Sequence, residues 1–202
     1  MSREEVAREA ARLLYNRSVK EYKDAKEMAA ASLGSRTLPS NYEVAVELDT
    51  LTDQYEDPGR QRMLIRMREI ALEVMRTLSD LSPVLIGSVW RGTVRNGSDI
   101  DIVVYHPESI KVTQMLGKYL IVEEEQKQFI LDGILRTSTH ISMILDDHPV
   151  EVVVRPPEDR DLYREERCET YGDLKRGISL PQLEKLMSAD PLRRFVPRRR
   201  NR

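Results

Sequence analysis

The stretch Gly87-Ser88-Val89-Trp90-Arg91-Gly92-Thr93-Val94-Arg95-Asn96-Gly97-Ser98-Asp99-Ile100-Asp101-Ile102 is the most informative part of the sequence. It follows a short apolar run at residues 84–86, and its last residues open a segment, 100–105, that is rich in β-branched side chains. Such segments are typical of buried strands. The stretch therefore predicts a turn and a short helix that join two strands.

Two acidic residues, Asp99 and Asp101, stand two positions apart where the second of these strands begins. Side chains alternate between the two faces of a strand, so both carboxylates emerge on one face, with Cα atoms roughly 6–7 Å apart. Two carboxylates this close repel each other unless a cation lies between them, and Mg²⁺ prefers such oxygen ligands. The pair predicts a metal site; two surface acids at a solvated strand end are the alternative for these residues taken alone.

The residues that precede this pair are suited to an anion. Gly87 lets the backbone turn tightly, and amide groups at the start of a helix, together with the Ser88 hydroxyl, suit a phosphate. Arg91 and Arg95 are four residues apart and share one side of the expected short helix. We expect either arginine to contact a phosphate or ribose, with a surface ion pair as the alternative.

The pattern G-S-x-x-R-G-T-x-R-x-x-S-D-I-D at residues 87–101 resembles the signature of the DNA polymerase β-like nucleotidyltransferase superfamily. It is most similar to the minimal and the predicted archaeal nucleotidyltransferases, and the core resemblance covers about residues 65–155. The resemblance implies a mixed sheet with flanking helices. It also implies Mg²⁺-dependent transfer of a nucleoside monophosphate from an NTP, with release of pyrophosphate.

The family has a third carboxylate on a later strand beside the Asp-x-Asp strand, and the residue here that fits is Glu151. It stands in the apolar segment 149–154, where an unpaired buried charge is costly and so needs a reason. We expect alternate valines of this segment to face the core and Glu151 to face the other way. The family usually has Asp at this point. Asp146 and Asp147, in a turn just before, are the alternatives.

The resemblance assigns a role to each of these residues. Asp99 and Asp101 are expected to hold two Mg²⁺ ions, with Mn²⁺ as an alternative ion, and Glu151 completes the metal site and accepts the proton of the attacking hydroxyl. Two metal ions stabilise both the attacking and the leaving oxygens of such a displacement. The triphosphate of the NTP is expected at the nucleotide-binding residues, which are Gly87, Ser88, Arg91 and Arg95.

The rest of the sequence predicts an α+β fold. Helical spacing dominates the first 80 residues, with capping-box spacing at Ser2 and at Ser40, and strand patterns follow. We expect a small mixed sheet of four to five strands flanked by helices, including a hairpin around Asp132-Gly133 that joins 128–131 to 134–145. The predicted organisation is an N-terminal helical region (1–57), a nucleotidyltransferase core (58–156), a C-terminal helical or irregular extension (157–192) and a basic tail (193–202).

Composition excludes several classes of protein. With 202 residues, 40% of them hydrophobic, the chain is long enough to bury a core. Its longest stretch without a charged residue runs only from Leu81 to Trp90, far short of the roughly 20 residues of a membrane span. The N-terminus lacks the apolar segment of a secretory signal. A single cysteine, Cys168, excludes an internal disulfide framework, so we expect a cytoplasmic protein without a membrane partner.

Charge is distributed unevenly, which bears on the partner. Residues 193–202 hold six arginines and no acidic residue, so removing them from a net charge of −2 leaves −8 for the rest. Such a tail suggests contact with a polyanion such as RNA, although a solubilising end has the same composition. The acceptor of the nucleotide stays open between RNA, a protein hydroxyl and a small molecule. A non-catalytic nucleotide- or RNA-binding module and an antitoxin-like interaction protein are the alternatives to an enzyme.

Overall fold

The computed structural model describes residues 2–131, 133–161 and 167–197, and the chain divides into two units. The helical unit comprises Met1–Arg60, Arg167–Asp173 and Pro197–Arg202, and the sheet unit comprises Gln61–Glu166 and Leu174–Val196. The division into four segments expected from the sequence stays a prediction. No helix in the described part of the chain is long and apolar enough to cross a membrane.

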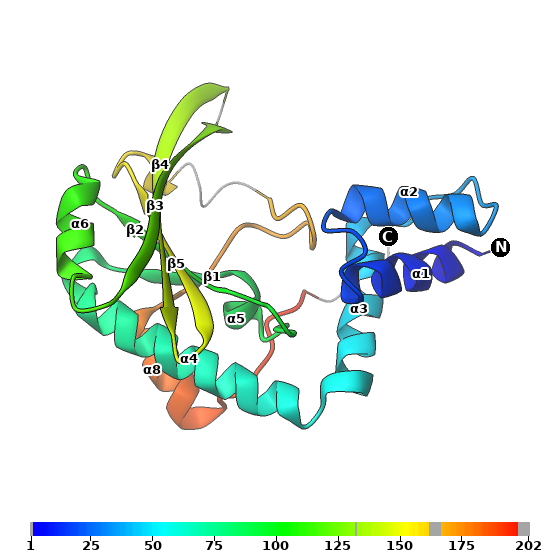
Figure 1. The fold of residues 1–202 in the computed structure, drawn as a ribbon, viewed down its shortest axis with the longest axis horizontal. Helices are drawn as coiled ribbons and strands as arrows, with labels where there is room; N and C mark the ends of the chain where they lie inside the picture. The colour runs from blue at the N-terminus through cyan, green and yellow to red at the C-terminus, as the bar shows by residue number, and fades with distance from the viewer. Residues whose placement is uncertain (1, 132, 162–166, 198–202) are drawn as a thin grey trace. The chain divides into compact units, whose positions relative to one another are not determined.

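The helical unit is built from α1 (Arg3–Tyr15), α2 (Tyr22–Ser32) and α3 (Asn41–Glu56), drawn from blue to cyan in Figure 1. Small apolar side chains on the facing sides of these helices form its core: Val6, Ala7, Ala10, Ala11, Leu14, Ala25, Ala29, Ala30, Val44 and Leu48. Alanine at so many of these positions lets the helix backbones approach closely. The helical periodicity of this part of the sequence is therefore confirmed.

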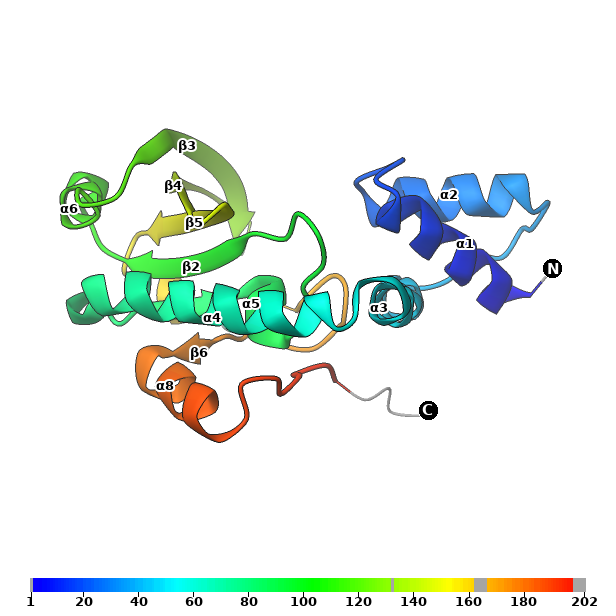
Figure 2. The ribbon, with the colours of Figure 1, turned by 60° about the horizontal axis from the view of Figure 1, so that its bottom comes forward.

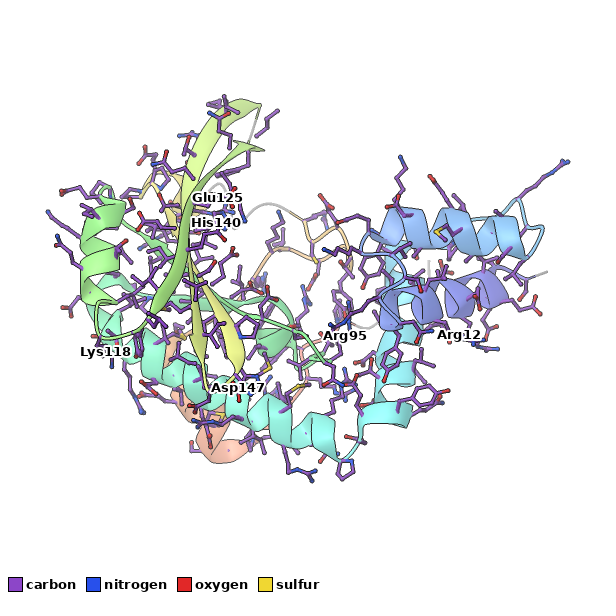
Figure 3. The ribbon with its side chains drawn as sticks, in the orientation of Figure 1. Arg12, Arg95, Lys118, Glu125, His140 and Asp147 are labelled. Carbon is purple, nitrogen blue, oxygen red and sulfur yellow. The ribbon has the colours of Figure 1, made fainter. Side chains whose placement is uncertain are left out.

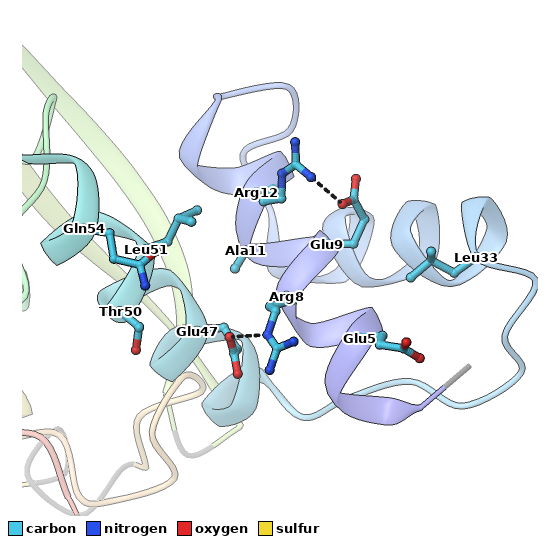
Figure 4. Close-up of a pocket in the computed structure, with 10 residues that line it drawn as sticks. All are labelled: Glu5, Arg8, Glu9, Ala11, Arg12, Leu33, Glu47, Thr50, Leu51 and Gln54. Atoms are coloured by element: carbon cyan, nitrogen blue, oxygen red, sulfur yellow. Dashed lines mark hydrogen bonds and ion pairs between the residues drawn. The ribbon is translucent and has the colours of Figure 1, made fainter.

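Two ion pairs lie on the rim of a groove in this unit, and one of them links α1 to α3, as Figure 4 shows. Arg8 reaches Glu47 at 3.3 Å, and Arg12 pairs with Glu9 at 3.8 Å on its own helix. Exposed pairs of this kind contribute only a few tenths of a kcal/mol up to about 1 kcal/mol each. The apolar core, rather than the rim, holds these two helices together.

Both predicted capping boxes are present. In the second, the Ser40 hydroxyl accepts the Glu43 amide at 3.2 Å, and the Ser40 amide donates to Glu43 Oε2 at 2.7 Å. Arg3 of α1 also donates to Glu43 Oε2, at 2.8 Å. Burial raises the pKa of Glu43, but the hydrogen bonds from Ser40 and Arg3 outweigh it and lower that pKa to about 2. The start of α3 is thus tied both to its own cap and to α1.

Within its described residues the sheet unit contains six strands, which run in the order β3-β4-β5-β2-β1-β6. Strands β2 and β5 are parallel, and every other neighbouring pair is antiparallel. The elements in chain order after α3 are α4 (Gly59–Thr77), a 3₁₀ turn (Ser79–Leu81), β1 (Val84–Ile86), α5 (Gly87–Arg91), β2 (Ile100–Tyr105), α6 (Ser109–Met115), β3 (Ile121–Leu131), β4 (Ile134–Leu145), β5 (His148–Arg155), β6 (Ile178–Ser179) and α8 (Leu180–Ala189).

The mixed α+β class is confirmed, with a sheet slightly larger than predicted. The added strand, β6, has only two residues, which is too short to leave a periodic signal. Strand β3 also begins earlier than the predicted residue 128. The sequence did not reveal its first part, because the run from Glu123 to Gln128 is polar and exposed and so lacks the alternation of a strand with one buried face. The predicted hairpin of β3 and β4 is present, although Asp132 itself lies outside the described residues.

One face of the sheet carries the main core. Helix α4 lies along this face in Figure 2, and α6 and α8 also contribute side chains to the core. The apolar stripe of α4 is buried and comprises Leu64, Met67, Ala71 and Val74, and Leu78, directly after the helix, is buried as well. Val150, Val152 and Val154 of β5 face the same core, as expected.

The opposite face of the sheet carries a small separate cluster. It consists of Val103 and Tyr105 on β2 and Val153 on β5, with Ile86 of β1 packed against them. Because side chains alternate along a strand, Asp101 and Glu151 lie on this second face, beside the cluster and away from the main core. The candidate catalytic acids therefore lie on this second face of the sheet.

Replacement of Ser40 by alanine is expected to destabilise the helical unit by about 1 kcal/mol at neutral pH, because the helix loses its cap. The loss should shrink as pH falls from about 4.5 towards 2. The stabilisation that depends on ionised Glu43 is present above its ordinary pKa and disappears as that carboxylate is protonated in the folded state. Thermal unfolding of both proteins across this pH range measures the effect.

Thr50→Ala is the matched control, because Thr50 is exposed on the same helix and its hydroxyl only returns to the Val46 carbonyl. This control should show little loss of stability at any pH. A Ser40→Ala protein as stable as the control at pH 7 would contradict the capping argument.

Candidate active site

The strand register brings two of the predicted carboxylates together. Asp101 of β2 lies directly opposite Glu151 of β5 on one side and Ile86 of β1 on the other. Residues directly opposite on neighbouring strands point to the same face, with strands about 4.8 Å apart. Asp99 is exposed just before β2 begins. The three acids therefore gather at the end of the sheet where β1 passes into α5.

The electrostatics of Asp101 reflect this crowding. Burial, together with the negative charges of Asp99 and Glu151, raises the pKa of Asp101 to about 7. Because this pKa is raised so far, ionisation of Asp101 in the folded protein costs free energy. A cation bound between the acids would remove that cost, which is the electrostatic condition for a metal site.

Glu151 is held by groups on neighbouring strands. Its Oε1 atom shares a hydrogen bond of 2.9 Å with His140 Nδ1 on β4 and lies 3.6 Å from Lys127 Nζ on β3. His140 Nε2 in turn lies 2.9 Å from the hydroxyl of Ser138, so three side chains form a hydrogen-bonded chain along the sheet face. Figure 3 labels His140 beside Glu125, its partner on β3.

The contact of His140 with Glu151 was not predicted from the sequence. The signal was the turn at Asp146 and Asp147, which both have positive φ angles, +47° and +63°. A two-residue turn of this kind fixes the register of the hairpin that it closes. Counting outward from it pairs Ser142 with Glu151, and His140 is then a diagonal neighbour of Glu151. The alternatives Asp146 and Asp147 are both exposed at this turn.

Gly87 is required where it stands. Its φ of +70° lies in the left-handed region, and a Cβ atom at this position would collide with Oδ2 of Asp101. The absence of a side chain lets the first turn of α5 lie against the carboxylate of Asp101. This close approach is the observation that ties the glycine-serine turn to the acids.

Ser88 and Arg95 are available to a ligand. The hydroxyl of Ser88, half-buried in α5, makes no hydrogen bond to any described residue. Arg95 donates its backbone amide to the Ser98 hydroxyl at 3.0 Å, while its guanidinium, labelled in Figure 3, pairs with no described residue. The turn from residue 95 to 98 therefore holds the backbone and leaves the charged end of Arg95 for solvent or a ligand.

Arg91 is placed differently from the other predicted nucleotide-binding residues. It is buried, donates to the Phe195 carbonyl at 3.1 Å and lies 4.6 Å from the centre of the Trp90 ring. The Phe195 amide donates back to the Arg91 carbonyl at 2.8 Å, and the Phe195 ring stacks on Trp90. Arg91 therefore anchors the C-terminal segment, and its expected contact with a phosphate stays a prediction.

Arg68 of α4 is another buried arginine, and the sequence did not predict its burial or its contacts. Its side chain is 0% exposed and donates to four backbone carbonyls, those of Val89, Trp90, Pro191 and Arg193. The last carbonyls of a helix lack partners within it, so Arg68 satisfies the end of α5 and binds the C-terminal segment at once. Burial lowers the pKa of Arg68 to about 10, which leaves it charged at neutral pH.

Comparison with known proteins identifies the family. The model of the nucleotidyltransferase domain family matches residues 67–167, which is half of the chain and includes β1, α5, β2 and β5. This chain belongs to the nucleotidyltransferase domain family. It belongs to the polymerase β-like superfamily, and the pattern at residues 87–101 resembles the signature of that superfamily.

Two solved structures also match this nucleotidyltransferase. The non-canonical poly(A) polymerase complex GLD-2–GLD-3 aligns with a TM-score of 0.32 and 18% identity, over 63% of this chain and 43% of that chain. The GLD-2/RNP-8 complex aligns with a TM-score of 0.27 and 20% identity, over 54% of this chain and 44% of that chain. The match thus spans less than half of either matched chain. No curated protein matches the sequence.

The residues of this nucleotidyltransferase fit a divalent cation in part. The donor set is carboxylate oxygen, and the raised pKa of Asp101 indicates an excess of negative charge at the site. Within residues 2–131, 133–161 and 167–197, however, no three His, Cys, Asp or Glu side chains are close enough together to form a metal site. Glu151 is turned to His140 and Lys127, so metal binding by Asp99, Asp101 and Glu151 together stays a prediction.

Replacement of Gly87 by alanine is expected to destabilise the sheet unit more than a positive φ angle alone would. A non-glycine residue in this region costs about 1–2 kcal/mol, and the collision with Asp101 adds to that cost. Gly133→Ala is the matched control, because Gly133 has a φ of +72° and nothing within 4 Å of the new Cβ atom. Denaturant unfolding measures both losses. Equal losses would show that Asp101 does not press on this position.

Replacement of Asp101 by asparagine is expected to stabilise the metal-free protein at pH 8, by roughly 1–4 kcal/mol. The pKa of Asp101 is raised in the folded state, so its contribution to stability is full below pH 4 and is lost as pH rises through about 7. The difference between the two proteins should therefore shrink towards pH 4. Thermal unfolding in a chelator measures it, with Asp161→Asn, at an exposed position, as the control. A constant difference across the range would contradict this explanation.

Proposed function

We propose that this nucleotidyltransferase moves a nucleoside monophosphate from an NTP to a hydroxyl group of an acceptor and releases pyrophosphate. The observation that carries the proposal is the contact of Gly87 with the largely buried carboxylate of Asp101, which itself lies opposite Glu151. This contact supports a phosphate site next to the acids on one sheet face. Transfer of a phosphoryl-type group depends mainly on positioning and on charge neutralisation, which such a site supplies.

Each residue has a proposed task. Asp99 and Asp101 would hold two Mg²⁺ ions, with Mn²⁺ as an alternative, and the bound ions supply charge neutralisation at the phosphates. The Gly87 amide, the Ser88 hydroxyl and the Arg95 guanidinium hold the triphosphate. Arg91 joins them only if Phe195 releases it, so Arg95 is the stronger candidate of the two arginines.

Glu151 acts on the acceptor side in this proposal. It completes the metal site and takes the proton from the attacking hydroxyl. The acceptor oxygen then forms its bond to the α-phosphorus, while the bond from that phosphorus to the bridging oxygen breaks and pyrophosphate leaves. His140, at 2.9 Å from Glu151, orients the carboxylate for this task.

The acceptor remains to be chosen among RNA, a protein hydroxyl and a small molecule, and the basic tail favours RNA. Arg193 and Arg194 are exposed in the described part of the tail, and Arg193 lies over the Phe195 ring. The remaining tail arginines, Arg198, Arg199, Arg200 and Arg202, lie outside the described residues. Contact between the tail and RNA is accordingly a proposal that rests on composition.

Asp99→Asn is expected to lower the rate of nucleotide transfer by at least about a hundredfold, because one proposed metal-binding carboxylate is lost. The test incubates the protein with each labelled NTP, Mg²⁺ and either total RNA or cell extract, and it follows label on the acceptor. Asp147→Asn is the matched control, because Asp147 is an exposed aspartate. Its backbone has a left-handed conformation, which asparagine also adopts readily.

The outcomes of this experiment separate the candidate functions. Wild-type transfer by the Asp99→Asn protein would exclude Asp99 from the site, and loss of transfer in the Asp147→Asn control would point to that alternative acid. If the unaltered protein transfers no label to any acceptor, a non-catalytic nucleotide-binding module or an antitoxin-like interaction protein replaces the enzyme as the leading hypothesis.

A further inference from the structure

A cavity of about 360 Å³ lies on the sheet face that carries Asp101. Its floor is formed by Val84 and Ile86 of β1 and by Val103 and Tyr105 of β2. Its wall is formed by the segment 174–177 together with Ser179 and Gln182. All of these residues belong to the sheet unit. The volume falls in the range of about 300–1,000 Å³ that is usual for small-molecule sites.

The strand register connects this cavity to the acids. Ile86 lies directly opposite Asp101, and Val84 lies directly opposite Val103. The floor of the cavity therefore continues the row of side chains in which Asp101 stands, on the same face of the sheet. A ligand that touches Ile86 is one side chain away from the Asp101 carboxylate.

The cavity and Glu151 lie on opposite sides of Asp101. In the strand order β5-β2-β1-β6, the cavity occupies the β1 and β6 side, while Glu151 and His140 occupy the β5 and β4 side. Ile86 is followed directly by Gly87 and Ser88, the residues that hold the triphosphate in the proposed function. The cavity is thus on the donor side of the site, away from the residue expected to deprotonate the acceptor.

The lining of the cavity suits a base with its ribose. Three aliphatic side chains and the Tyr105 ring give an apolar floor, and the wall adds the Ser179 hydroxyl and the Gln182 amide. Gln182 uses its oxygen for the cap of α8, accepting the Ser179 amide at 2.8 Å, while its amide nitrogen pairs with no described residue. That nitrogen is a donor for the polar edge of a base.

The wall is held in place by backbone contacts rather than by the ligand. Strand β6 pairs Ser179 with Val84 and Ile178 with Leu85. A Cβ atom at Gly177 would collide with the Leu85 carbonyl and with the side chains of Val84 and Ile86, so this part of the wall lies directly on β1. The cavity is therefore formed before a ligand arrives, which reduces the ordering cost of binding.

We propose that this cavity binds the base and ribose of the NTP, with Gln182 donating to the base. The inference rests on the proposed function, since the triphosphate at Gly87 and Ser88 is what brings the nucleoside to the cavity. It adds to that function a site for the part of the donor that carries its chemical identity, and hence for selection among NTPs.

The experiment compares two kinds of ligand by titration calorimetry with the full chain and Mg²⁺. One kind is a non-hydrolysable analogue of each of the four NTPs, and the other is inorganic tripolyphosphate. The unaltered protein is expected to bind its preferred analogue at least about tenfold more tightly than tripolyphosphate, because only the analogue fills the cavity. Val84→Phe, which narrows the cavity, should remove most of this difference while leaving the affinity for tripolyphosphate within about twofold.

Gln182→Glu is a second variant that keeps the fold, because glutamate at this position also completes a capping box with Ser179. It removes the amide donor, so the affinity for the preferred NTP should fall roughly three- to tenfold. Gln114→Glu, on the exposed side of α6, is the matched control for the added negative charge and should change neither affinity.

Each outcome decides a different point. If both cavity variants bind the NTP as tightly as the unaltered protein, or lose both ligands equally, the nucleoside site is overturned while triphosphate binding stands. In the label-transfer assay with the same variants, a rise only in the KM for the acceptor would assign the cavity to the acceptor and likewise overturn the nucleoside site. If the unaltered protein binds neither ligand, the proposed function fails and takes this inference with it.

Discussion

The contact between Asp101 and Gly87 is the constraint on which this nucleotidyltransferase site depends. Pairing of β1 with β2 sets Ile86 opposite Asp101, so the residue after Ile86 has to turn past a carboxylate. Only a residue without a side chain fits there, because of the positive φ angle and the proximity of Oδ2. A slip of one residue in this register would point Asp101 into the apolar core. Fold and chemistry are therefore specified by the same pair of strands.

Much of this arrangement was accessible from the sequence. Helix starts at Ser2 and Ser40 followed from capping-box spacing, and the α4 stripe followed from its apolar period. The strand that carries Glu151 was expected to alternate between core valines and an outward acid, and it does so. These predictions succeeded because each rests on contacts between residues close together in the chain. The resemblance of residues 87–101 to a family signature then supplied the chemistry.

The features that the sequence did not reveal depend on long-range contacts. Arg68 lies among apolar positions of α4, and its acceptors are backbone carbonyls up to 125 residues away, which no side-chain pattern announces. Arg91 was expected at a phosphate, but a segment more than 100 residues later reaches it in the structure. His140 required the hairpin register, and β6 is too short to give a periodic signal. In each case a distant part of the chain decides the surroundings of one residue.

The two outer strands of the sheet have a consequence for the behaviour of this protein in concentrated solution. A free strand edge offers unpaired amides and carbonyls to any other extended chain. Strand β3 covers that risk with the consecutive glutamates Glu123, Glu124 and Glu125, which would face like charges if two such edges met. Strand β6, at the other edge, is two residues long and offers little to extend. One edge thus resists pairing with another chain by charge repulsion, and the other because it is short. Ile130, Ile134 and Leu135 are exposed apolar side chains near the end of the hairpin, but neither edge of the sheet offers a long uncharged strand for a second chain to pair with.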